Sequence, residues 1–577
     1  VYKRQVWPYY VGYEIEDNAT VVLDNWYVTQ NNVTSDSYGI DAGPYEIAYY
    51  MYNNTSFMMG DFVITHNNVT SGDDGIYADY YYVGYYIYGN ASVIMGDFII
   101  SWNNLTSDDD GIYYYFYGVG SGLYGKIDGG NSVIIGESRI EGNILDTDSE
   151  GIYVYYGIAY DFYYDSYMIM DSLYINDNEI KSADDAIYLY FSWAAQDMYD
   201  NSLFLMNDTY IADNLIDSSG YGIFIDYPEE DVVYDIYDNA MVYLPDYIIT
   251  GNTINADDDS IYFYMYENIY YVEDETRVYA GGFTIEDNTF ISNNGVYLYY
   301  YDVCYNGYDS VITFGDIDVT SNEFHVDNKA VWIDGDVGYD LYGNAQLNIG
   351  NITIDDNSMD CAYGVDVGYE ISARDDTEAI VGFINVEGNE IRNCTDDGIF
   401  IWYSSYAGDS STIFIGDTIV EKNTIDNCSK GIHVYCNIGN DTDAVAETGR
   451  TYIMSNAISN CSYGIYLSEG WNHTDITGNT ICNNDVGIYV YGGYEGDYYY
   501  NADTEIHWNK IYNNSDYGLI YEIKIGGTPY INATYNFWGN GNGPSNTSMI
   551  DPVTGMQAEG TGDAIGGGVA NDNIHFD

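Results

Sequence analysis

The sequence predicts an all-β protein: a single-stranded, right-handed parallel β-helix solenoid of about fifteen coils. Two observations support this prediction. One short motif recurs along almost the whole 577-residue chain, and the segments that follow it are rich in β-branched and aromatic residues bounded by Gly and Asn. Because the chain has a fixed internal period, we predict one repeat array rather than the several domains that its length alone would suggest. The apolar residues lack helical spacing, so we expect stacked strands and no long helix.

The repeated motif consists of Asn, any residue, an apolar residue, a short polar turn, and a small residue followed by an apolar one. The motif starts fifteen times, at Asn31, Asn67, Asn103, Asn143, Asn178, Asn214, Asn252, Asn288, Asn322, Asn357, Asn389, Asn423, Asn456, Asn479 and Asn509. The residue two positions later is apolar in every copy, from Val33 to Ile511. We therefore expect this position to face the core of each coil.

The length of the shortest repeat indicates the size of one coil. Gly464 and Gly487 close successive turns only 23 residues apart, which fits three short strands and three turns. Coils of parallel strands stack about 4.8 Å apart, so fifteen of them make a rod of roughly 70 Å. We expect the additional residues of longer copies to lengthen strands or to form loops on one flank.

Stacking of identical coils also explains the Asn and Tyr positions. An inward amide at a turn can bond to its copies above and below, which predicts an asparagine ladder. The Tyr column after the turn should point outward, and its members are Tyr77, Tyr113, Tyr153, Tyr188, Tyr262, Tyr466 and Tyr489. Two interpretations of this column stay open: a platform on which sugar rings stack, or simple stacking between coils.

Composition limits the partners of this chain. Only 14 Lys and Arg stand against 91 Asp and Glu, so the protein should repel nucleic acid and anionic membrane surfaces. Because no apolar run has membrane-spanning length, we expect no direct membrane insertion. The acidic surface suits a saline medium, where salt screens self-repulsion.

Sequons for N-glycosylation are dense. If the chain is exported, the candidate acceptors include Asn32, Asn68, Asn104, Asn393, Asn427 and Asn460. The alternative is that a sequence rich in Asn and Thr forms sequons by chance. The overall pattern favours an extracellular or cell-surface location.

The chain divides into three segments. Residues 1–5, "VYKRQ", are interpreted as a non-native remnant, residues 6–536 as the parallel β-helix, and residues 537–577 as a truncated closing segment.

Three stretches carry a family resemblance: "NTIDNCSKGIHVY" from Asn423, "NTICNNDVGIYVY" from Asn479, and "YNFWGNGNGPSN" from Tyr535. In these stretches the chain resembles the right-handed parallel β-helix proteins of the pectate-lyase-like class, and most closely the NosD-like repeats of archaeal surface proteins. The resemblance implies the fold. Enzymes of that class cut or epimerise polysaccharides, but a repeat signature is weak evidence for activity.

Acidic residues recur at the same turn in four successive copies. The candidate metal ligands are Asp73, Asp74, Asp109, Asp110, Glu150, Asp184 and Asp185. Stacked carboxylates must raise their pKa values or recruit cations, and oxygen-rich clusters suit Ca²⁺. The alternative is a solvated acidic turn.

No set of residues stands out as catalytic. The six His look isolated, and Cys394, Cys428 and Cys461 recur at one position, as a disulfide or a column of buried thiols. We therefore expect a non-catalytic secreted or cell-surface protein with a structural, adhesive or glycan-binding role. Its partner would be a polysaccharide or cell-envelope glycan. The alternative is a polysaccharide-active lyase, hydrolase or epimerase.

Overall fold

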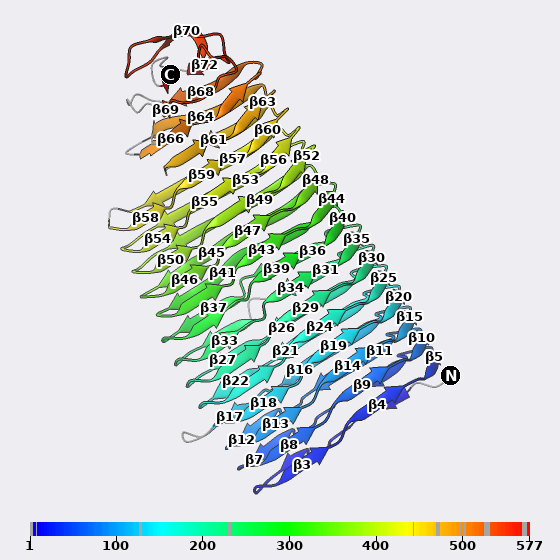
Figure 1. Ribbon diagram of the computed structural model, residues 1–577. Coiled ribbons are helices and arrows are strands. Elements are labelled where there is room, and N and C mark those ends of the chain that lie inside the picture. Colours follow the sequence, from blue (N-terminus) through cyan, green and yellow to red (C-terminus); the bar gives the residue numbers. More distant parts are fainter. Residues whose placement is uncertain are drawn as a thin grey trace.

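The computed structural model in Figure 1 shows an elongated, all-β parallel solenoid of about 14 turns. It describes residues 4–6, 8–125, 130–228, 232–441, 443–468, 473–495, 498–500, 504–523, 531–567 and 574–576. These residues contain strands and turns and no helix. Accordingly, no helix within them has the length and apolarity needed to cross a membrane.

The motif Asn directly precedes each strand of a 15-stranded parallel sheet that runs along the rod. Its first three strands are β5 (Asn32–Ser35), β10 (Asn68–Ser71) and β15 (Asn104–Ser107), and its last is β67 (Lys510–Tyr512). Val69 pairs in register with the equivalent residue on either side. Side chains alternate exposed and buried along these strands, so the apolar residue after each Asn enters the core, as predicted.

The shortest coil contains three strands, as its length predicts: β60 (Ala457–Ser459), β61 (Tyr463–Ser468) and β62 (Thr474–Thr477). Longer coils use their additional residues for a further sheet. That sheet has thirteen strands, from β3 (Thr20–Leu23) to β58 (Val445–Thr448). The cross-section is therefore wider over most of the rod than at its C-terminal end.

The asparagine ladder forms, and the amides of its buried members have hydrogen-bond partners, as Asn103 shows. The Asn103 backbone N–H and its Nδ2 both donate to Asn143 Oδ1 at 3.0 Å, and Nδ2 also donates to the Ile64 carbonyl at 3.0 Å. Asn509 repeats this pattern with Asn536, so the ladder extends one residue beyond the fifteen predicted. Trp538, two residues after Asn536, is buried like the apolar residue of every other copy.

Both ends of the chain continue the stacking. At the N-terminus, β1 (Arg4–Val6) pairs with β6 (Ile40–Ala42), whereas residues 1–3 of the segment predicted to be a remnant lie outside the described residues. In the predicted closing segment, β72 (Ile565–Gly567) adds to β68 (Tyr517–Ile523). An antiparallel pair, β70 (Ser545–Ile550) and β71 (Gln557–Glu559), lies at the C-terminal end in Figure 1. Residues 568–573 and 577 of this segment lie outside the described residues.

Candidate functional site

The predicted acidic turn is present, and it has an inner and an outer column of side chains. Asp74, Asp110 and Asp185 are buried, at 5%, 6% and 8% exposure, whereas Asp109 and Asp184 are exposed. Asp73 and Glu150 are half-buried. The carboxylate oxygens of Asp73, Asp74 and Asp109 approach within 4.8 Å of one another, so these three could share a cation.

Burial and mutual repulsion perturb the inner column. Desolvation, followed by the charge of Asp109, raises the pKa of Asp74 to about 7, and desolvation also raises the pKa of Asp185 to about 7. Burial and a hydrogen bond with the Glu150 carboxyl raise the pKa of Asp110 well above its usual range. The column therefore retains protons near neutral pH unless cations replace them.

The predicted Tyr column faces outward, and its rings contact one another. Tyr77 stacks on Tyr113 with ring centroids 5.3 Å apart, and Tyr153 stacks on Tyr188 at 4.9 Å. Tyr113 and Tyr153 meet edge to face at 4.9 Å, and the column continues through Phe224. Because neighbouring rings occupy the stacked faces, the column presents mostly ring edges to solvent.

All six predicted glycan acceptors are exposed. Asn32, Asn68 and Asn104 are register partners in successive coils, so their side chains lie one strand spacing apart. Asn104 Nδ2 donates to Asn68 Oδ1 at 2.9 Å. Glycans on adjacent acceptors would compete for space, because strands lie only about 4.8 Å apart.

The predicted recurrence of Cys produces a column of free thiols. Hydrogen bonding to the neighbouring thiol and burial together raise the pKa of the Cys394, Cys428 and Cys461 thiols. These groups behave as small core residues, since raised pKa values disfavour the reactive thiolate.

The structure reveals an aromatic pocket of about 260 Å³ that the motif alignment missed. It is lined by Tyr82, Tyr85, Tyr117, Gly118, Ser121, Tyr160, Trp193 and Gln196. In the outward column that contains Tyr117 and Trp193, the register position between them is Gly157. Because Gly157 has no side chain, the Trp193 ring covers it and meets the Tyr117 ring edge to face, with ring centroids 5.4 Å apart and a 67° interplanar angle. The sequence signal for this pocket is Gly157, a glycine within an otherwise aromatic column.

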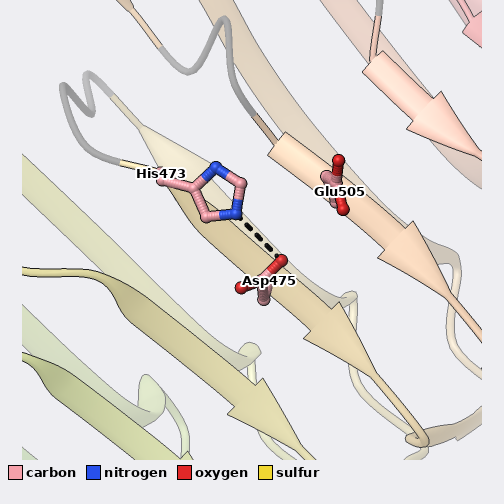
Figure 2. Close-up of side chains that lie close together, drawn as sticks. All are labelled: His473, Asp475 and Glu505. Carbon is pink, nitrogen blue, oxygen red and sulfur yellow. Dashed lines mark hydrogen bonds and ion pairs between the residues drawn. The ribbon is translucent and has the colours of Figure 1, made fainter.

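His473 looks isolated in the sequence, but in the structure it lies in a cluster with two acidic residues. The expectation that all six His are isolated was therefore wrong. Figure 2 shows His473 directly before β62 and Asp475 within it, with Glu505 on the neighbouring strand β66 (Thr504–His507). His473 Nε2 lies 3.0 Å from Asp475 Oδ1, and one ligand atom from each residue lies within 4.8 Å of the others. Counting four residues back from Asn479 and from Asn509 places the two acids at one repeat position, which was the available signal.

A second His group spans three coils of the largest sheet. His433 Nδ1 lies 2.8 Å from Asp397 Oδ2, and its Nε2 lies 2.8 Å from Ser468 Oγ. Lys430 Nζ contacts both oxygens of the buried Asp397 carboxylate at 3.1 Å. The imidazole packs on the Phe400 ring with centroids 4.4 Å apart. These residues come from β53 (Asp397–Ala407), β57 (Lys430–Asn440) and β61. His433 contacts Asp397 and Ser468 diagonally across these strands and not as directly paired residues.

In comparisons with known proteins, no family model and no curated protein matches the chain. The structure shows a parallel β-solenoid built from repeats.

Proposed function

We propose that this protein is a non-catalytic, secreted or cell-surface solenoid of the pectate-lyase-like class, with NosD-like repeats and a structural, adhesive or glycan-binding role. The observation that favours glycan binding is the aromatic pocket at Tyr117 and Trp193. Tyr and Trp side chains combine an apolar ring with a polar tip. A pyranose likewise combines a C–H face with a hydroxyl rim.

The size and charge of the pocket define the ligand class. Its volume of about 260 Å³ lies just below the range for drug-sized ligands, which fits one sugar ring rather than a long stretch of polymer. A net charge of −77 repels acidic polymers such as polyuronates. The proposed ligand is therefore a neutral glycan of the cell envelope or its surroundings.

A glycan array, run beside an activity screen on neutral and acidic polysaccharides, tests this function. We expect retention of neutral glycans without turnover. Turnover of a polysaccharide would exclude the non-catalytic role, and failure to retain any neutral glycan would exclude glycan binding.

We propose Ca²⁺ as the cation of the acidic turn. The support is chemical: three carboxylates within 4.8 Å supply the oxygen ligands that Ca²⁺ prefers, and a divalent ion relieves their repulsion. The test is thermal unfolding with and without a chelator at pH 8. We expect Ca²⁺ to raise the melting temperature, and an unchanged melting temperature would exclude the cation.

One observation favours the alternative, a polysaccharide-active enzyme. Asp397, His433 and Ser468 have the hydrogen-bond order of a carboxylate–imidazole–hydroxyl triad. In the tautomer in which His433 Nδ1 donates to the Asp397 carboxylate, Nε2 is left to accept the Ser468 proton. The Ser468 oxygen could then attack an ester carbonyl, the leaving alcohol would take the proton from Nε2, and water would release the acid from the acyl-serine.

Covalent labelling tests this alternative on the full chain. If the alternative holds, a fluorophosphonate probe labels wild type, but not Ser468→Ala, whereas Ser404→Ala, a half-buried serine on β53, retains full labelling. Equal labelling of Ser468→Ala and wild type would exclude an activated Ser468.

A further inference from the structure

We infer that His473, Asp475, Glu505 and His507 form a binding site for one Zn²⁺ ion between two neighbouring coils. Asp475 in β62 and Glu505 in β66 are register partners on adjacent parallel strands. His473 precedes Asp475 by two residues and His507 follows Glu505 by two. Because side chains alternate along a strand, all four project from the same outward face.

The distances among His473, Asp475 and Glu505 suit a shared ion after small side-chain rotations, and His507 Nε2 lies 3.5 Å from the Glu505 carboxylate. A tetrahedral ion with bonds of about 2.0–2.2 Å holds its ligand atoms about 3.4 Å apart. His473 Nε2 and Asp475 Oδ1 are 3.0 Å apart, and the nearest Glu505 oxygen lies within 4.8 Å of both. All four side chains are partly exposed, so an ion can enter from solvent.

The orientation of His507 supplies the independent argument. Its Nδ1 lies 2.9 Å from the Thr534 carbonyl oxygen, which only accepts, so Nδ1 carries the proton. Metal-bound His residues typically make this type of contact. The other ring nitrogen, Nε2, lies 3.5 Å from Glu505 Oε2, so the contact with Thr534 orients it toward the Glu505 carboxylate.

The donor set selects the type of metal. Two imidazole nitrogens with two carboxylates suit Zn²⁺, whereas Ca²⁺ and Mg²⁺ favour oxygen ligands alone. Arg450 Nη1 lies 4.0 Å from Asp475 Oδ2 and competes with a cation for that oxygen. Its side chain is 58% exposed, so it can turn toward solvent when the ion binds.

The test is Zn²⁺ titration of the chelator-treated full chain by calorimetry, with bound metal counted by mass spectrometry. We expect wild type to bind one more equivalent than His473→Ala/Glu505→Gln, and His507→Ala to bind about 10–100-fold more weakly. His325→Ala is the matched control, because His325 contacts Glu323 at 3.0 Å in the same two-residue spacing but has no second His. Arg450→Gln should bind more tightly.

Co²⁺ provides a readout that nonspecific binding to surface acids does not give. We expect wild type and His325→Ala to show the visible absorption of four-coordinate Co²⁺, and the double variant to lack it. Equal Zn²⁺ stoichiometry in wild type and the double variant, both with native circular dichroism, would overturn the site. Displacement of Zn²⁺ by equimolar Ca²⁺ would overturn its assignment.

Discussion

At the residue scale, the hydrogen bonds of the ladder Asn side chains explain why the same residue recurs in the motif. Each amide accepts twice from the Asn below and donates to the Asn above and to a carbonyl, as Asn252 does to Asn288 Oδ1 at 3.0 Å and to the Ile211 oxygen at 2.8 Å. Asp has the same shape but lacks the donors, and Ser is too short to span the coils. This explains why Asn recurs at this position in all fifteen copies of the motif.

The first prediction concerns Asn252→Asp. The substitution places a buried carboxylate against the carbonyl oxygens that the amide now satisfies, so we expect a loss of about 2–5 kcal/mol in the free energy of unfolding. The exposed Asn255, three residues further along in β35 (Thr253–Ala256), provides the control: Asn255→Asp loses the bond from Nδ2 to Asp217 Oδ1 at 2.7 Å and adds a like charge, but it should cost less than about 1 kcal/mol because solvent screens both carboxylates. Urea unfolding measures both, and equal losses would contradict the ladder's role.

The second prediction concerns pH and Asp185. Its pKa is raised to about 7 in the folded chain, above the value near 4 of an unfolded Asp. The folded state therefore holds this proton more tightly, so the associated stability is complete below pH about 4 and is lost as pH rises through about 7. Without divalent cations, Asp185→Asn should be about 1–3 kcal/mol more stable than wild type at pH 8 and similar to it at pH 4.

The matched control for this prediction is Asp148→Asn, an exposed residue of the same acidic region. Its unfolding free energy should change by less than about 0.5 kcal/mol at both pH values. Asn retains the oxygen that accepts the Tyr221 N–H at 2.8 Å, so the backbone contact survives the substitution. A destabilised Asp185→Asn at pH 8 would show that the ionised carboxylate is stabilising.

At the element scale, an alignment of the repeats predicts some features of the coils and misses others. The ladder, the core positions and the acidic turn all lie at fixed offsets from the motif Asn, and the alignment predicts each of them. The aromatic pocket depends on Gly157 interrupting one column, and the Asp397–His433–Ser468 contacts run diagonally across three strands. Such diagonals depend on side-chain direction and strand register, which spacing alone does not specify.

The third prediction concerns the thiol column in the turns before the largest sheet. Cys394, Cys428 and Cys461 are buried and their pKa values are raised, whereas Cys482 is partly exposed. Iodoacetamide should therefore modify Cys482 in the native protein and reach the other three only after unfolding. Peptide mass spectrometry measures this, and native modification of Cys428 would contradict the packing of the column.

At the scale of the whole molecule, one continuous core supports a highly charged surface. Buried apolar residues form a single cluster from Ile15 to Phe576. The net charge of −77 destabilises this compact state through electrostatic self-repulsion. Salt weakens the repulsion, because the Debye length falls to about 10 Å at 0.1 M.

The fourth prediction follows from that balance. The urea midpoint at pH 8 should rise steadily as NaCl increases from about 0.01 M to 1 M, where the Debye length falls from about 30 Å to 3 Å. Choline chloride should have a similar effect, since screening depends on ionic strength rather than on a particular cation. A midpoint independent of ionic strength would show that self-repulsion does not limit the fold.

The most direct test of the proposed glycan-binding role is the affinity of a neutral oligosaccharide, chosen from the array, for wild type and for Tyr117→Ala/Trp193→Ala. Removing both walls of the pocket should weaken binding at least about 10-fold, equivalent to about 1.4 kcal/mol. Tyr264→Ala, which removes an outward ring of the same sheet outside the pocket, should bind like wild type. Undiminished binding by the double variant would contradict the assignment of the pocket as the glycan site.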